Sequence, residues 1–131
     1  MFRLTLLGDP RTKKNSQQIL YKGSTPFITQ SEAYRQYAES CGWQIRVVPG
    51  IKLPCNVKMV YYMATHRRVD LCNLQEATLD ILVRYGVLED DNCKIVVSMD
   101  GSRVDYDKEN PRVEVTITEA VKCKGWEMDE I

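Results

Sequence analysis

Hydrophobic and polar residues alternate in several separate stretches of the chain, and each stretch predicts a β-strand. Residues 2–7, FRLTLL, are stopped by a Gly-Asp-Pro sequence, and residues 55–64, CNVKMVYYMA, alternate over most of their length. Residues 112–118, RVEVTIT, show the same period of two. Such alternation gives a strand one buried and one solvated face. Residues 94–99 are a further strand candidate, because an Asp-Gly turn signal follows them.

Two other stretches repeat apolar residues every three or four positions, which is the spacing of an amphipathic helix. The first predicts a helix over residues 31–46, beginning at the capping-box sequence Thr-Gln-Ser-Glu. The second predicts a helix over residues 73–85 that ends at Gly86. The residues on these two apolar faces are Tyr34, Tyr37, Ala38, Cys41 and Ile45 in the first helix, and Leu74, Ala77, Thr78, Ile81, Leu82 and Tyr85 in the second.

The order of these elements is strand, basic loop with a short hairpin, helix, strand, helix, strand, strand. This order predicts an α/β (α+β) fold in which two helices pack on a small mixed β-sheet. A length of 131 residues suits one domain over residues 1–131. The opening MFRLTLLGDP becomes polar too soon for a signal peptide, and no apolar run approaches the ~20 residues that span a bilayer.

The overall charge points to no particular partner, since 18 basic residues balance 18 acidic ones. This balance argues against a protein that simply coats a polyanion. Positive charge is nevertheless concentrated in residues 8–22, where Arg11, Lys13, Lys14 and Lys22 outnumber Asp9. The five cysteines are odd in number and form no CxxC pair, so we expect a cytoplasmic chain with reduced thiols rather than a zinc site.

Carboxylates lie at both ends of the second predicted helix. Asp70 precedes it within HRRVDLCNLQE, and Asp90 and Asp91 follow it within LEDDN. A helix over residues 73–85 is about 20 Å long, so the fold must bring the chain back for Asp70 and Asp91 to meet. Carboxylates that meet repel one another until a divalent cation joins them, and oxygen ligands favour Mg²⁺, with Mn²⁺ as the alternative.

Basic residues near these carboxylates would hold the phosphates of a nucleic acid. Arg67 and Arg68 lie just before Asp70, and Lys13 and Lys14 lie in the loop after the first strand. An ordinary explanation exists for each feature. Acidic residues near a helix start interact with the helix dipole, and an acidic turn or basic loop is commonly just solvated.

A resemblance to a known family helps to decide between a functional site and ordinary solvated charges. Residues 67–91, RRVDLCNLQEATLDILVRYGVLEDD, resemble the central motif of the RusA-type Holliday junction resolvases, which has a basic run, Asp-x-Asp-Asn-Leu, a lysine and a closing Asp-Asp. The segment from Gly8-Asp9-Pro10 to Lys13-Lys14-Asn15 resembles the amino-terminal Gly-x-Pro…Lys of the same family. The resemblance implies a small homodimer that binds branched DNA, specifically four-way junctions, and uses Mg²⁺ to cut two symmetric strands.

The sequence departs from the family pattern at two positions. Asp70 and Asp91 match family aspartates, whereas Cys72 stands in place of the second aspartate and Glu76 in place of the lysine. A thiol is a poor ligand for Mg²⁺. In one account Glu76 supplies the missing carboxylate, which makes Asp70, Glu76 and Asp91 catalytic and adds Asp90 to the metal ligands.

Two other accounts stay open. In one of them the protein binds DNA junctions without cutting them, because the site has lost a carboxylate. In the other it is an interaction or regulatory protein that keeps only the fold. We favour the nuclease, because a site that had decayed would not need a new carboxylate one helical turn beyond Cys72.

Overall fold

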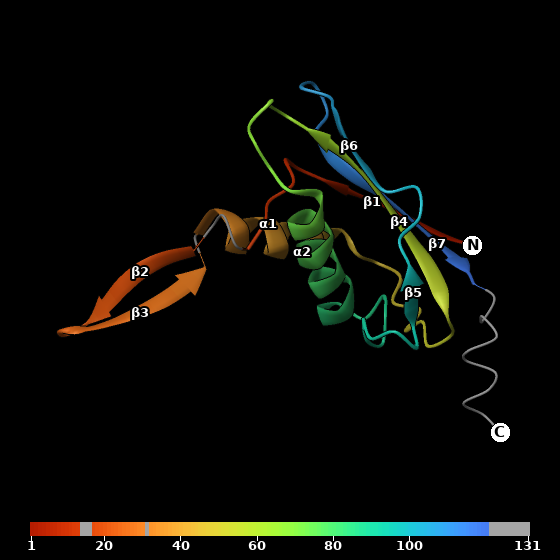
Figure 1. Ribbon diagram of the computed structural model, residues 1–131, viewed down its shortest axis with the longest axis horizontal. Coiled ribbons are helices and arrows are strands. Elements are labelled where there is room, and N and C mark those ends of the chain that lie inside the picture. Colours follow the sequence, from red (N-terminus) through yellow and green to blue (C-terminus); the bar gives the residue numbers. More distant parts are fainter. Residues whose placement is uncertain (14–16, 31, 121–131) are drawn as a thin grey trace.

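A five-stranded mixed sheet forms one side of the protein (Figure 1). The computed structural model describes residues 1–13, 17–30 and 32–120. In the sheet β7 lies between β1 and β4 and is antiparallel to both, while β5 and β6 each pair in parallel with the other edge of β4. The five strands are β1 (Phe2–Leu7), β4 (Cys55–Met63), β5 (Val96–Ser98), β6 (Arg103–Tyr106) and β7 (Arg112–Glu119).

Two helices and a separate hairpin complete the described fold. The helices are α1 (Glu32–Gln44) and α2 (Leu71–Arg84), and the hairpin joins β2 (Gln17–Lys22) to β3 (Thr25–Gln30) as a two-stranded sheet of its own. The hairpin extends away from the main sheet in Figure 1. Within the described residues, no helix has the length and apolar character needed to cross a membrane.

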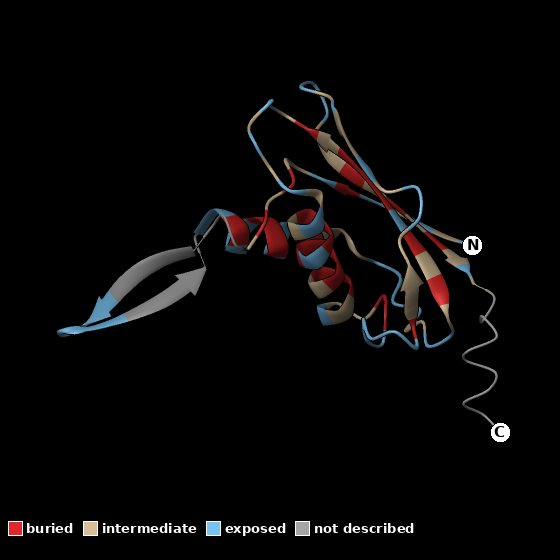
Figure 2. Cartoon of the chain, in the orientation of Figure 1, coloured by how far each residue is buried: buried red, intermediate tan, exposed pale blue. Residues whose placement is uncertain are grey.

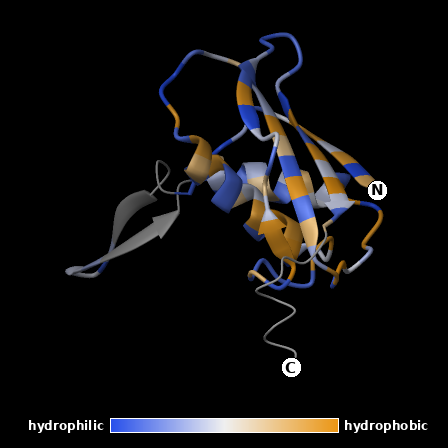
Figure 3. Cartoon of the chain, turned by 45° about the vertical axis from the view of Figure 1, so that its right-hand side comes forward, coloured by the Kyte–Doolittle hydropathy of each residue, from blue (hydrophilic) through white to orange (hydrophobic). Residues whose placement is uncertain are grey.

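Both helices pack on one face of the sheet, and the hydrophobic core lies between the helices and the sheet (Figure 2). The sheet strands alternate between hydrophobic and hydrophilic positions in Figure 3, as the sequence pattern predicts. The fully buried core residues with the largest side chains are Leu6, Val57, Met59, Tyr61, Met63, Val113 and Val115 from the strands, Leu74, Ile81 and Leu82 from α2, and Val87 and Leu88 beyond it.

A buried hydrogen-bond chain fixes α2 against β4. The hydroxyls of Tyr61 and Thr78 lie 2.7 Å apart, and the Thr78 hydroxyl donates to the carbonyl of Leu74 at 2.9 Å. Burial raises the pKa of Tyr61 well above its ordinary value, so its hydroxyl stays neutral. Because buried hydroxyls need partners, this chain favours one position of the helix on the sheet.

The structure confirms the predicted fold class and most of the predicted elements. Helix α2 begins two residues earlier than predicted, and Gly86, at φ 84, ends it in the left-handed conformation that favours glycine. The sequence analysis missed β6, a four-residue strand whose end residues are exposed. The predicted capping box before α1 includes Ser31, which lies outside the described residues.

Candidate functional site

Asp70 stands at the N-cap position of α2, and its carboxylate is not used to cap the helix. Its backbone is extended (φ −94, ψ 129), and its carbonyl accepts the amide hydrogens of Asn73 and Leu74. The side chain makes no capping hydrogen bond, and among the described residues it accepts a hydrogen bond only from the side-chain amide of Asn73, at 3.3 Å. Aspartate at this position normally bonds a helix N–H. The exposed carboxylate of Asp70 is therefore available for another ligand.

Asp9 holds the segment that leads to Asp70. One of its carboxylate oxygens accepts the amide of Ala64 at 3.0 Å, and the other lies 2.6 Å from the guanidinium of Arg67. Arg67 also donates to the carbonyl of Pro10 at 2.5 Å. These charge-assisted contacts join the loop after β1 to the loop after β4. The Arg67 side chain, which the sequence analysis predicted to bind DNA, thus bonds residues of its own chain.

Arg68 and His66 lie on the exposed side of the same loop. Arg68 is exposed, and among the described residues its side chain has no hydrogen-bond or ion-pair partner. The imidazole of His66 stacks on the ring of Tyr106, with 3.8 Å between the ring centroids. Tyr106 is itself 44 % exposed. The loop before Asp70 and the end of β6 thus present an exposed guanidinium and an exposed aromatic pair, which suit contacts to phosphates and bases.

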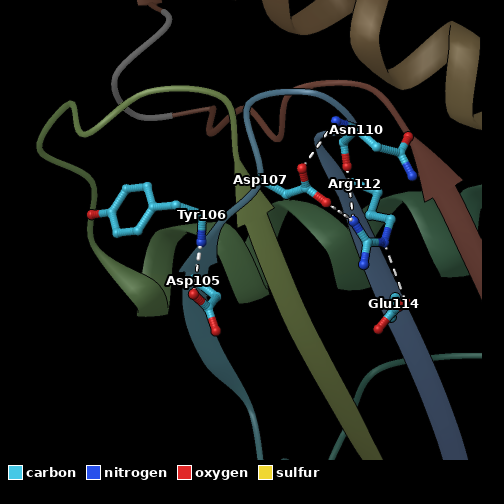
Figure 4. Close-up of polar contacts among 6 residues, drawn as sticks. All are labelled: Asp105, Tyr106, Asp107, Asn110, Arg112 and Glu114. Carbon is cyan, nitrogen blue, oxygen red and sulfur yellow. Dashed lines mark hydrogen bonds and ion pairs between the residues drawn. The ribbon is translucent and has the colours of Figure 1, made fainter.

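Hydrogen bonds from Arg112 hold the segment that carries Tyr106 (Figure 4). Arg112 donates to the carboxylate of Asp107 at 2.9 Å, to that of Glu114 at 3.2 Å and to the carbonyl of Asn110 at 2.9 Å. The hydrogen bond from Arg112 lowers the pKa of Asp107. The Arg112 guanidinium also lies 3.9 Å from the ring centre of Tyr62. The segment from β6 to β7 is therefore fixed beside the end of β4.

Asp90 and Asp91 lie in an exposed turn beyond the other end of α2. The Asp90 carboxylate accepts the Asp91 amide at 2.8 Å and the side-chain amide of Asn92 at 3.0 Å, and these bonds lower the pKa of Asp90. Asp91 is exposed, and its side chain makes a smaller contribution to the lowered pKa of Asp90. Asp90 thus shapes the turn, and the carboxylate of Asp91 lies exposed beside it.

The two acidic ends of α2 do not meet within one chain. Helix α2 has 14 residues, which makes it about 21 Å long, and Asp70 precedes it while Asp91 follows it. In the described ranges, no three His, Cys, Asp or Glu side chains are grouped so as to hold a metal ion. The predicted set of Asp70, Glu76, Asp90 and Asp91 therefore does not fit a cation site built from a single chain.

The remaining predicted residues lie along α2 and in the loop after β1. Cys72 and Glu76 are exposed on successive turns of one face of the helix. Lys13 forms an ion pair with Asp80 on the same face, so this lysine is tied to the helix. Lys14 lies outside the described residues.

Sequence reasoning did not find the supporting roles of Asp9, Tyr106 and Arg112. Asp9 stands inside the Gly-Asp-Pro segment that carried part of the family resemblance, and this was the available signal. Tyr106 lies in the segment between the two predicted strands, which shows no periodic pattern, and the period that predicted a strand from Arg112 onward does not indicate which residues its side chain contacts. Their contacts depend on the pairing of β6 and β7 with β4, a long-range feature of the fold.

Comparison with known protein families identifies the family of the chain. The family model described as "Endodeoxyribonuclease RusA" matches residues 8–118, which is most of the chain. The match includes Asp9, the basic segment before α2, and the turn with Asp90 and Asp91. A search of curated proteins found no match.

Proposed function

Because the chain belongs to the RusA endodeoxyribonuclease family, we propose that it is a Mg²⁺-dependent, homodimeric nuclease that resolves four-way DNA junctions. Family membership itself supports endodeoxyribonuclease activity on branched DNA. The observation that supports metal-dependent cutting is the exposed carboxylate of Asp70, which makes no capping hydrogen bond to the helix. The exposed Arg68 lies two residues before it. A junction offers two equivalent strands, and a two-fold dimer has two equivalent sites.

Each proposed residue has a specific task. Asp70, Asp91 and Asp90 are the proposed acidic residues of the site, and Glu76 supplies the carboxylate that Cys72 lacks. Arg68 contacts a phosphate that flanks the cut. When bound, the divalent cation neutralises charge that builds up on the phosphodiester. The His66–Tyr106 stack presents aromatic faces to bases that are unpaired at the branch point.

A second candidate is a protein that binds junctions without cutting them. The observation that favours it is the thiol of Cys72, an exposed side chain next to the helix start at a place where the family pattern has a carboxylate. Such a protein would keep Arg68 and the aromatic pair, and with them its affinity for DNA.

A labelled four-way junction separates these proposals. The protein is incubated with the junction in Mg²⁺, in Mn²⁺ and in EDTA, with a linear duplex of the same sequence as control. The nuclease predicts paired, symmetric nicks that need the metal and that Asp70→Asn abolishes. A shifted but uncut junction would support the binding protein. An absence of any shift at low salt would leave only an interaction protein with this fold.

The role of Glu76 has its own variants. We expect Glu76→Gln to abolish cutting while junction binding persists, because the amide cannot replace a negatively charged ligand. Glu39→Gln is the matched control, since Glu39 is an exposed helical glutamate on α1. Cutting by Glu76→Gln at the rate of the unmodified protein would remove Glu76 from the site. Cys72→Asp should preserve or raise the activity.

A further inference from the structure

We infer that the open edge of β1, together with the groove beside it, binds an extended acidic segment of a partner protein as an added β-strand. The starting observation is that β1 ends the sheet. It pairs with β7 along one edge, and no strand within the described residues pairs with its other edge. An edge of this kind is a template for a further strand. This surface takes no part in the proposed nuclease function.

The side chain of Gln44 already imitates one residue of such a strand. Its carboxamide oxygen accepts the amide hydrogen of Leu7 at 2.6 Å, and its nitrogen donates to the carbonyl of Leu7 at 3.0 Å. A residue of a neighbouring antiparallel strand makes the same two bonds with its backbone. The edge of β1 therefore binds an amide group in the way that strand addition requires.

The backbone of Thr5 and Arg3 offers the next two positions along this edge. Successive residues of an edge strand turn their backbone groups alternately toward the neighbouring strand and away from it. The amide of Gly8 donates to the carbonyl of Pro111 on the β7 side, whereas the backbone of Leu7 faces the open edge. Thr5 and Arg3 therefore also direct their N–H and C=O groups outward. A strand that continues from the position of the carboxamide can pair with both.

A groove between β1 and α1 gives the added strand a place for its side chains. The groove has a volume of about 720 Å³, and its large apolar side chains are Trp43 from α1 and Leu7 from β1. Trp43 is 84 % exposed and Leu7 is 52 % exposed. Tryptophan is enriched among the few residues that supply most of the affinity at protein interfaces. Apolar side chains of the added strand thus have an anchor in Trp43.

The charges at this edge favour an acidic segment. Arg46 lines the groove, and Arg3 extends from β1 itself. Both arginines are exposed, and among the described residues neither side chain has a hydrogen bond or an ion pair. Glu39 also lines the groove, so positive charge remains in excess. Carboxylates of the added strand pair with the two arginines, and this complementarity selects the partner.

Two other occupants fit this edge less well. A second β1 placed antiparallel about Thr5 would set Arg3 against the partner's Leu7, whose backbone Gln44 already occupies. A pairing centred on Arg3 would bring two arginines together. A nucleic acid would place phosphates against the backbone carbonyls of the edge and against Glu39. A peptide backbone supplies donors and acceptors in alternation, as the edge does.

A short fluorescein-labelled peptide that alternates glutamate and valine is the probe for this surface. Its fluorescence anisotropy is measured as the full-length protein is added. We expect saturable binding, and binding at least about tenfold weaker for a peptide that alternates lysine and valine. Trp43→Ala should weaken binding of the first peptide at least about tenfold. The matched control is Tyr21→Ala, which removes an exposed aromatic side chain from the hairpin and should bind as the unmodified protein does.

The outward N–H of Thr5 is tested by a pair of substitutions. Thr5→Pro removes this donor and keeps the ladder with β7, because an edge strand accepts proline where the N–H faces solvent. It should lower the affinity for the peptide at least about tenfold, whereas Thr5→Val, which keeps the donor, should bind as the unmodified protein does. Circular dichroism and urea denaturation show whether both variants fold. Equal binding by the two folded variants would overturn the inference.

Peptides with methylated backbone nitrogens test strand addition without any change to the protein. In an added strand every second N–H faces β1, so N-methylation of either the valines or the glutamates should abolish binding, and N-methylation of the other set should preserve it. Loss of binding with both sets, or with neither, would overturn strand addition. The same result decides the question if Thr5→Pro does not fold.

A labelled oligothymidine is the nucleic-acid probe for the same surface. Its binding should be the same for the unmodified protein and for Trp43→Ala, because the groove is assigned to a peptide. Weaker oligothymidine binding by Trp43→Ala, together with unchanged peptide binding, would overturn the inference and assign the groove to single-stranded DNA. Absence of any binding of the glutamate–valine peptide would overturn it as well.

Discussion

Two neighbouring arginines have different surroundings in this structure. Arg67 is half-buried and bonds Asp9 and Pro10, whereas Arg68 is exposed. We expect Arg67→Ala to lower the free energy of unfolding by about 1–3 kcal/mol, since it removes charge-assisted bonds and leaves Asp9 poorly paired. Arg68→Ala should leave stability unchanged and weaken junction binding for all sequences. The slope of the logarithm of the binding constant against the logarithm of the salt concentration should fall by about one, the loss of one phosphate contact. Urea denaturation and junction binding at several salt concentrations measure both effects.

The opposite result at either arginine would contradict this assignment. A stable Arg67→Ala protein with weak DNA binding would show that Arg67 leaves Asp9 when DNA binds. From the sequence the two residues were indistinguishable, because the partner of Arg67 lies 58 positions away along the chain. The sequence shows two neighbouring arginines, but it does not show which of them a distant carboxylate binds.

Among the helices and strands, those with a long and regular hydrophobic period were the ones that the sequence predicted. Helix α2 was predicted closely because its apolar face repeats over four turns, and Gly86 marks its end. Strand β6 was missed because RVDY is short and half of it is exposed. Its place beside β4 depends on parallel pairing with residues Val60–Met63, which no local pattern encodes.

The segment between β6 and β7 should respond to acid. Because Arg112 lowers the pKa of Asp107, this carboxylate contributes stability that is fully present above its unfolded pKa of about 3.9 and is lost as the pH falls through the lower folded value. We expect Asp107→Asn to be less stable than the unmodified protein at neutral pH, with a difference that shrinks below about pH 4.

Urea midpoints measured across this pH range test the expectation. Asp100→Asn is the matched control, because Asp100 is exposed and bonds Asn56 through its backbone rather than its carboxylate. The control should track the unmodified protein at every pH. A constant difference between Asp107→Asn and the unmodified protein over the whole range would show that the charge on Asp107 is not the cause.

At the scale of the whole molecule, α2 acts as a spacer as well as a core element. Its buried face fixes it on the sheet through Tyr61 and Thr78, and its length separates Asp70 from Asp91. The sequence analysis predicted both carboxylates and expected the sheet to return the chain so that they meet. It could not predict that one chain keeps them apart, because this depends on how the loops at both ends of α2 are anchored.

If the proposed homodimer is the form that binds the cation, metal binding and dimerisation must be linked. Anything that binds the dimer but not the monomer shifts the equilibrium toward the dimer, by an amount set by its concentration relative to its dissociation constant. Mg²⁺ should therefore lower the dimer dissociation constant relative to EDTA at equal ionic strength. Sedimentation equilibrium of the unmodified protein measures this shift directly, and no DNA is needed.

Two variants make this linkage specific to the proposed acidic residues. Asp70→Asn and Asp91→Asn should each abolish the Mg²⁺ effect, and Glu39→Gln on the exposed face of α1 should retain it. Without metal the two Asn variants should dimerise slightly better than the unmodified protein, because each removes a charge from a cluster of carboxylates that repel one another. A dimer dissociation constant that is the same in Mg²⁺ and EDTA would mean that monomer and dimer bind the cation equally well or not at all.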